Sequence, residues 1–179
     1  KNDKFNKSIF TNFNSKKIRL NVETTTSYEK DTKKGILEIL FINKNTSMNY
    51  SIDKNSLSFD SQNNKNNYNG VIDFKPFYFS AKFDYEGISS KNFFNNNSIF
   101  IDLINSEILN NKNLSANLNL NVKNITNIDE LNNLNLNIAI EEGDISFSDS
   151  KIMWKQDLEI NFDESLLTFG DDGINLVGT

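Results

Sequence analysis

The sequence predicts a mostly β protein: a curved antiparallel meander sheet, forming a half-barrel or groove, with one short α-helix. Apolar and polar residues alternate with a period of two along much of the chain, which is typical of strands with one buried face. Short segments rich in Gly, Asp and Ser separate these strands. One segment alone has helical spacing. A β-sandwich, in which two sheets cover each other's apolar faces, is the alternative.

Three segments show the alternation most clearly. In 77–85 the odd positions are apolar or aromatic, whereas in 116–123 and 134–141 the even positions are apolar and most odd ones are polar. Shorter alternating segments follow at 145–147, 152–154, 158–162, 166–169 and 174–177. Because the segments between them carry turn residues, as in Glu142-Gly143-Asp144, we expect neighbouring strands to pair antiparallel.

The predicted helix covers Ser98–Leu109. Phe100, Ile104 and Ile108 recur there at steps of four residues, and Asn97 or Ser98 can cap the first turn. One helix of this length cannot cover a sheet of many strands. The apolar face must therefore meet a second sheet, close on itself as a barrel, or form a groove that a non-protein partner fills.

Composition excludes several classes of protein. At 179 residues the chain is expected to form one β-rich domain over 1–179, and because it begins with Lys1 we expect a segment of a longer protein. It has no Cys and no His, which excludes disulfides, zinc sites built from those ligands and Ser-His-Asp catalysis. The net charge of -5 argues against a nucleic-acid partner. The 33 Asn residues are interpreted as a compositional bias at solvent-facing positions.

No motif indicates catalysis, a metal or a cofactor. The acidic groups at 141–144 and 171–172 lack the spacing of a calcium loop, and their residues are the ones that hairpin turns require. We therefore predict a protein that is not an enzyme and holds no metal ion and no cofactor.

The order of elements in the C-terminal part resembles a known family. The stretch 70–79 (GVIDFKPFYF) precedes the helical segment, the turn 110–114 (NNKNL), a long alternating strand and 142–150 (EGDISFSDS). This order resembles the C-terminal part of AsmA-like proteins, which are related to the TamB and YhdP bridge proteins. The family's G-x-I-x-L-x-x-S hairpin matches at Gly143, Ile145, Phe147 and Ser150, with Phe in place of Leu. The resemblance covers 70–179.

The resemblance implies a non-enzymatic lipid-transport module. Family members carry phospholipid through a periplasmic apolar groove between the inner and outer membranes of Gram-negative bacteria. We accordingly expect a phospholipid or another acyl-chain lipid as partner, a periplasmic location with an inner-membrane anchor upstream of Lys1, and edge-to-edge contact with further repeats. A structural or adhesive β-sandwich of the cell surface is the alternative function.

The residues expected to line the lipid groove are the apolar positions of the alternating strands. Single members of this set could equally be ordinary core residues. They are Phe77, Phe79, Phe83, Tyr85, Ala116, Leu118, Leu120, Val122, Leu134, Leu136, Ile138, Ile140, Ile145, Phe147 and Trp154.

Overall fold

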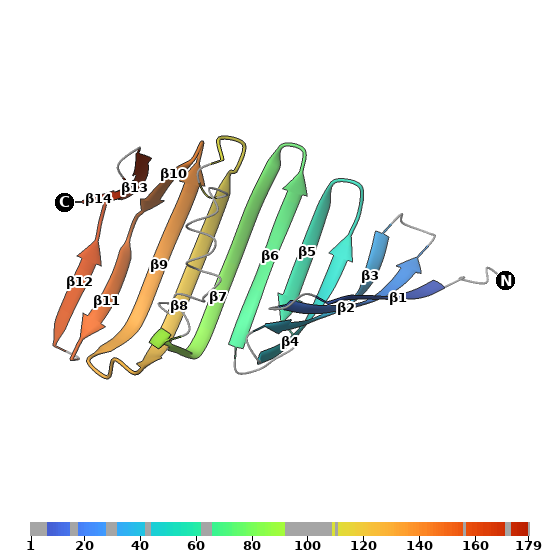
Figure 1. Cartoon of the computed structure of the whole chain (residues 1–179), viewed down its shortest axis with the longest axis horizontal. Coiled ribbons are helices and arrows are strands. Elements are labelled where there is room, and N and C mark those ends of the chain that lie inside the picture. The colour runs from blue at the N-terminus through green and yellow to red at the C-terminus, as the bar shows by residue number, and fades with distance from the viewer. Residues whose placement is uncertain are drawn as a thin grey trace. The chain divides into compact units, whose positions relative to one another are not determined.

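The computed structural model describes fourteen strands in two compact units, Lys1–Pro76 and Phe77–Thr179 (Figure 1). It describes residues 7–14, 18–27, 32–41, 44–61, 66–91, 109, 111–155, 157–170 and 173–178. Each unit is treated by itself below. The expectation of one continuous domain stays a prediction.

The N-terminal unit is an antiparallel meander, in which each strand pairs with the next one along the chain. Its strands are β1 (Lys7–Asn14), β2 (Ile18–Ser27), β3 (Thr32–Phe41), β4 (Lys44–Ile52), β5 (Ser56–Ser61) and β6 (Asn66–Phe74).

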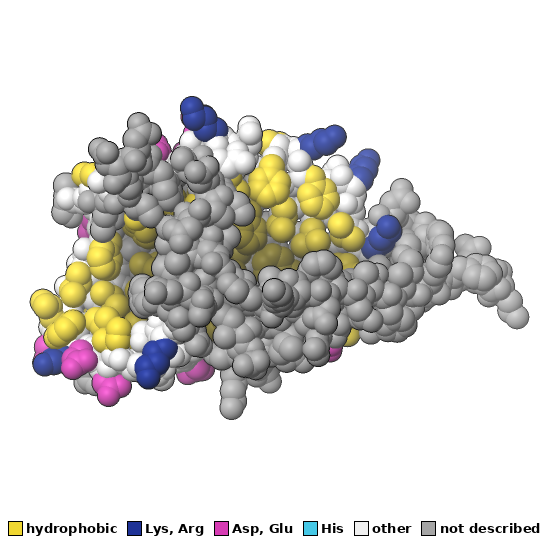
Figure 2. All heavy atoms as spheres, in the orientation of Figure 1, with side chains coloured by type: hydrophobic (Ala, Val, Ile, Leu, Met, Phe, Trp, Pro, Cys, Tyr) yellow, Lys and Arg dark blue, Asp and Glu magenta, His cyan; other side chains and the backbone are white. Residues whose placement is uncertain are grey.

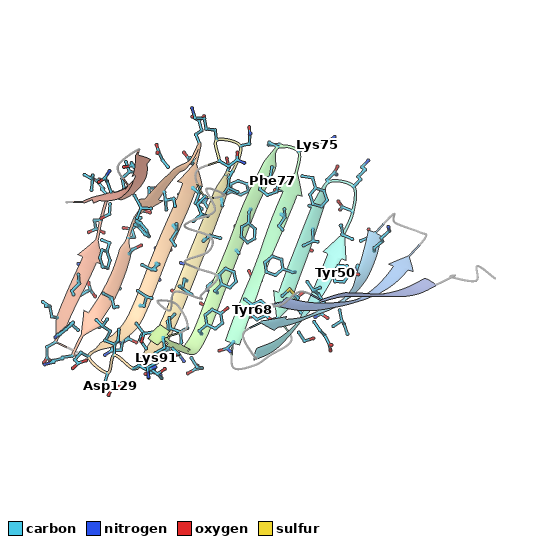
Figure 3. All side chains as sticks on the ribbon, in the orientation of Figure 1. Tyr50, Tyr68, Lys75, Phe77, Lys91 and Asp129 are labelled. Atoms are coloured by element: carbon cyan, nitrogen blue, oxygen red, sulfur yellow. The ribbon has the colours of Figure 1, made fainter. Side chains whose placement is uncertain are left out.

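Aromatic side chains pack across the last strands of this unit. Tyr50 on β4 lies opposite Gly35 on one side and Phe59 on the other, and Phe59 in turn lies opposite Gly70. Tyr50 and Tyr68 are buried (labelled in Figure 3). The Tyr68 hydroxyl donates a 2.9 Å hydrogen bond to the Ser47 carbonyl, so the buried phenol keeps a polar partner.

The turn between β4 and β5 is closed by Asp53. The backbone N–H groups of Asn55 and Ser56 donate to Asp53 Oδ1 at 2.7 and 2.9 Å. These two bonds favour the ionised carboxylate and lower the pKa of Asp53. Such an Asx turn explains why Asp stands where the chain reverses.

The C-terminal unit is a mixed sheet with the strand order β7-β8-β9-β10-β13-β14, from which β11 and β12 branch at β9. Its strands are β7 (Phe77–Ser89), β8 (Ala116–Thr126), β9 (Leu131–Glu141), β10 (Asp144–Phe147), β11 (Ser150–Trp154), β12 (Leu158–Phe162), β13 (Ser165–Gly170) and β14 (Gly173–Val177).

The β7–β8 pair is parallel, which corrects the prediction that all neighbours pair antiparallel. A parallel pair requires a crossover that returns the chain to the same end of the sheet, and a tight turn cannot provide it. The chain between Ser89 and Ala116 is that crossover. The predicted helix at Ser98–Leu109 falls within it and, apart from Leu109, lies outside the described residues.

The β8–β9, β9–β10, β11–β12 and β13–β14 pairs are antiparallel hairpins, as predicted. The reversals expected at 148–150 and 163–164 do not pair their flanking strands, because β10 pairs with β13 and β11 pairs with β9. The β9–β10 hairpin turns at Glu142 and Gly143, whose φ angles are 52° and 92°. Two consecutive left-handed residues make the turn that matches strand twist, and glycine adopts the second position without strain. The structure thus confirms a mostly β meander whose sheet is open, with one parallel pair inserted.

The sheet forks along β9. The C-terminal part of β9 pairs with β10, and its N-terminal part pairs with β11, so β10 and β11 together form one interrupted partner strand. The interruption falls at Asp149, which has a φ angle of 48°. In Figure 1, β10, β13 and β14 accordingly lie at the upper end of β9, and β11 and β12 lie at its lower end.

Ser150 holds the interruption together. Its side chain is fully buried, and its Oγ accepts a 2.8 Å hydrogen bond from the Asn137 backbone N–H. The single hydroxyl proton has two acceptors in reach, the carbonyl oxygens of Asn137 and Ser148 at 3.3 and 3.2 Å. The hydroxyl replaces backbone hydrogen bonds that β9 loses at the interruption between β10 and β11.

We expect Ser150→Ala to lower the free energy of unfolding by about 1–3 kcal/mol, because it leaves the buried N–H of Asn137 without an acceptor. Ser148→Ala, at an exposed side chain two residues away, is the control and should change the free energy by less than about 0.5 kcal/mol. Urea unfolding followed by circular dichroism measures both. Equal effects would show that the Ser150 hydroxyl does not stabilise the fork.

Candidate functional site

The apolar residues of the C-terminal unit lie in cross-strand rows on one face of the sheet. The pairings of β7 with β8, β8 with β9 and β9 with β10 are all in register with the alternation. Four rows result, and we call them, with Phe77 at the start of β7, the apolar face. The rows are Phe79–Ala116–Ile140–Ile145, Ala81–Leu118–Ile138–Phe147, Phe83–Leu120–Leu136 and Tyr85–Val122–Leu134.

This face continues onto β11 and β12. Lys151 lies opposite Asn135, which belongs to the other face, so Ile152 projects to the same side as the four rows. The register between β9 and β11 shifts by one residue after Lys151, but β11 pairs regularly with β12, which keeps Trp154 on the side of Ile152. Across the next pair, Ile152 lies opposite Ile160, and Trp154 lies opposite Leu158. All fifteen predicted lining residues therefore occupy one side of the sheet.

Several members of the face are absent from the predicted set although the same alternation indicates them. Ala81 is buried in the second row, and Ile152, Leu158 and Ile160 extend the face at the fork. Assigning every second residue of 77–85 and 152–162 to the apolar face would have included all four of them in the predicted set.

One end of the apolar face is packed. Ala116, Ile140 and Ile145 form a buried cluster, and Phe79, Ile138, Phe147 and Leu167 pack against it. Leu109 and Leu114, which belong to the crossover between β7 and β8, also pack there. The described end of the crossover thus covers this end of the face.

The other margins of the face are exposed to solvent. Phe77, Trp154 and Leu158 have 46%, 40% and 57% of their surface exposed. Figure 2 shows hydrophobic side chains (yellow) on this side, including a group at the lower left over the β11–β12 hairpin. The described strands of the unit belong to one hydrogen-bonded sheet, so none of them supplies a second sheet over this face.

The apolar face carries no charge. In β7 to β12 every Lys, Asp and Glu of the strand interiors lies on the opposite side, where Lys123 Nζ lies 2.6 Å from Glu86 Oε1 and Lys151 Nζ lies 3.1 Å from Glu159 Oε2. The ring of Tyr85 stacks on Phe83 with centroids 6.3 Å apart. Burial raises the pKa of Tyr85, so its hydroxyl stays neutral.

The opposite face is held by asparagine amides. Asn121 lies opposite Asn135, and Asn119 lies opposite Asn137. The four side chains form a closed cycle: Asn121 donates to Asn119, Asn119 to Asn137, Asn137 to Asn135, and Asn135 back to Asn121. We call this the amide ring.

The ring is anchored on both sides. Asn121 Nδ2 also donates to Asp84 Oδ1 on β7 at 2.6 Å, and Asn137 Nδ2 donates to the Asp149 carbonyl at 3.1 Å. The interpretation of Asn as mere compositional bias is incomplete for these four residues. Alternation in 117–121 and 135–137 placed them on one face, but only the strand register shows that they meet.

A hollow of about 560 Å³ lies where β8 turns into β9, next to the Tyr85–Val122–Leu134 row. In Figure 3, Asp129, which lines the hollow, and Lys91 lie toward one end of β7, and Phe77 lies at the other end. The hollow combines apolar, amide, hydroxyl and charged groups. Its lining consists of Lys123, Asn124, Ile125, Thr126, Asp129, Leu131, Asn132 and Asn133.

Among the residues that the structure describes, no group of three Asp or Glu side chains converges as a metal site. No buried side-chain nitrogen or oxygen in that part of the chain lacks a hydrogen-bond partner. The arrangement therefore offers an apolar surface with a satisfied polar back, which suits binding by burial of apolar groups.

Comparison with known proteins returned no match to a family model, to a curated protein or to a solved structure.

We expect Asn121→Ala to lower the free energy of unfolding by about 1–2 kcal/mol, because it removes three side-chain hydrogen bonds. Asn117→Ala, which removes one bond to the Tyr78 hydroxyl, should lower the free energy of unfolding by about 0.5 kcal/mol.

A double-mutant cycle on Asn119 and Asn135 tests whether the ring acts as a unit. These two residues share both ring neighbours without bonding each other, and we expect a coupling free energy of about 0.5–1 kcal/mol between them. Additive effects at this diagonal pair would mean that the amides act as separate bonds.

Proposed function

We propose that the C-terminal unit binds acyl-chain lipid, and phospholipid in particular, on its apolar face and serves as a transport module without a catalytic step. The observation that supports this most is the charge-free face itself. Four in-register rows of aliphatic and aromatic side chains run across β7 to β9, two of them reach β10, and no described strand supplies a second sheet over them.

The dimensions of the face suit an acyl chain. From Leu134 to Ile140 the strand advances by about 20 Å. One leaflet of a bilayer has a hydrocarbon thickness of about 15 Å, half of the full core. An acyl chain laid along the strands would bury CH2 groups at about 0.8 kcal/mol each.

The hollow beside the last row supports an amphipathic ligand. Its amides, its hydroxyl and Asp129 lie where the apolar rows end, so they would meet a head group while the chain lies on those rows. Because the hollow holds one group of each sign and Lys123 is already paired with Glu86, we expect little discrimination between head-group charges.

The resemblance to AsmA-like proteins supports the same function and suggests its setting. On that basis we propose a periplasmic module of a longer protein anchored in the inner membrane, carrying phospholipid toward the outer membrane. In the described part of the chain, no helix has the length and apolar character needed to cross a bilayer.

Binding is tested with saturated fatty acids of increasing length that compete with a fluorescent fatty acid. We expect the Kd to fall about fourfold for each added CH2 group until the chain exceeds the face, because each group adds about 0.8 kcal/mol of burial. The absence of binding at any length would contradict the proposal and favour a self-contained scaffold.

Leu136→Asp serves as the matched negative variant in the same assay. Leu136 is half-buried at the β9 end of the third row, where a carboxylate would have to be desolvated beneath the ligand. We expect fatty-acid binding to weaken at least tenfold while circular dichroism shows a folded sheet. Asn117→Asp adds the same charge to β8 at an exposed position of the opposite face, outside the hollow, and should bind normally. Unfolding of the Leu136 variant alone would indicate a packed core instead.

A further inference from the structure

β12 is an edge strand of the C-terminal unit. Among the described strands it hydrogen-bonds only to β11. An edge strand presents alternate backbone N–H and C=O groups away from the sheet, ready to pair with another strand. Its five residues are Leu158, Glu159, Ile160, Asn161 and Phe162.

We propose that a second copy of this chain pairs antiparallel with β12, with the two-fold axis passing at Ile160. In that register Ile160 lies opposite the partner's Ile160, Leu158 lies opposite the partner's Phe162, and Glu159 lies opposite the partner's Asn161. Apolar residues meet apolar residues on one side, and each carboxylate meets an amide on the other. The sequence of β12 is therefore complementary to itself, as an isologous interface requires.

Neighbouring registers are less favourable. A shift of one residue would place the apolar side of one copy against the polar side of the other. A shift of two residues would place Glu159 opposite the partner's Glu159 or the partner's Asp163, which brings like charges together. Charge and pattern thus select the register centred on Ile160.

The pairing would bury apolar surface that β12 leaves exposed. Leu158 has 57% of its surface exposed, and its partner on β11, Trp154, has 40% exposed. Across the two-fold axis, Leu158 would contact the partner's Phe162, and the apolar sides of the two sheets would become continuous. The pairing uses the edge of the sheet, so it does not rest on lipid binding.

Cysteine cross-linking tests the register directly, because the chain has no cysteine of its own. In Ile160→Cys the two introduced thiols would face each other across the axis at a Cα separation of about 5 Å, within the range of a disulfide. In Leu158→Cys they would be about 13 Å apart along the strands. We expect Ile160→Cys to form the disulfide-linked dimer at least tenfold faster under a mild oxidant. Equal rates for the two variants, or no cross-linked dimer, would overturn the proposal.

Charge variants at Asn161 test it without altering the apolar face. Asn161 is exposed and lies opposite Lys151 within its own chain and opposite the partner's Glu159 in the proposed dimer. Asn161→Lys should strengthen the dimer about 2- to 30-fold in sedimentation equilibrium, and Asn161→Asp should weaken it by a similar factor, since each change acts at two symmetric pairs.

The stability of the single chain should change in the opposite direction. Lysine at position 161 would lie beside Lys151, whereas aspartate there would attract it. Dimer strength that follows chain stability, or a dimer indifferent to both variants, would contradict the proposal. Fatty-acid binding by both variants should stay unchanged, which separates failure of this pairing from failure of the proposed lipid function.

Discussion

The structure of the C-terminal unit depends on register: β7, β8, β9 and β10 pair so that the apolar positions of the four rows meet across neighbouring strands. A slip of one residue in any pair would move an entire set of side chains to the wrong face. The parallel β7–β8 pair obeys the same rule as the antiparallel pairs, since Phe79, Phe83 and Tyr85 match Ala116, Leu120 and Val122. This constraint produces both the apolar face and its polar back.

Two different interactions hold that register. On one side, aliphatic and aromatic rows pack, most tightly around Ala116, Ile140 and Ile145. On the other, Asn119, Asn121, Asn135 and Asn137 can close their ring only when Asn121 lies opposite Asn135. Hydrogen bonds are directional, so the ring specifies alignment more sharply than apolar contact does. A satisfied polar back thereby leaves the apolar side available for binding.

The sequence predicts the strands and the shared face of the C-terminal unit well, because a period of two is read directly from residues such as Leu118 and Leu136. It does not predict the parallel pair. That pairing depends on where the chain returns after Ser89, and the alternation of β7 and β8 is the same in either direction. The fork escapes prediction as well, because the single left-handed residue Asp149 separates β10 from β11 inside what reads as a turn. The amide ring requires strand register, which composition does not contain.

The central claim is that this apolar side is a binding surface and not half of a closed core. Native mass spectrometry of the protein purified without detergent tests it most directly. We expect a mass excess that matches phospholipid and that is lost when collisional activation releases the bare chain. If the protein is purified from cells that supply phospholipid throughout expression and the spectrum still shows the bare chain alone, the result would contradict a lipid-binding surface.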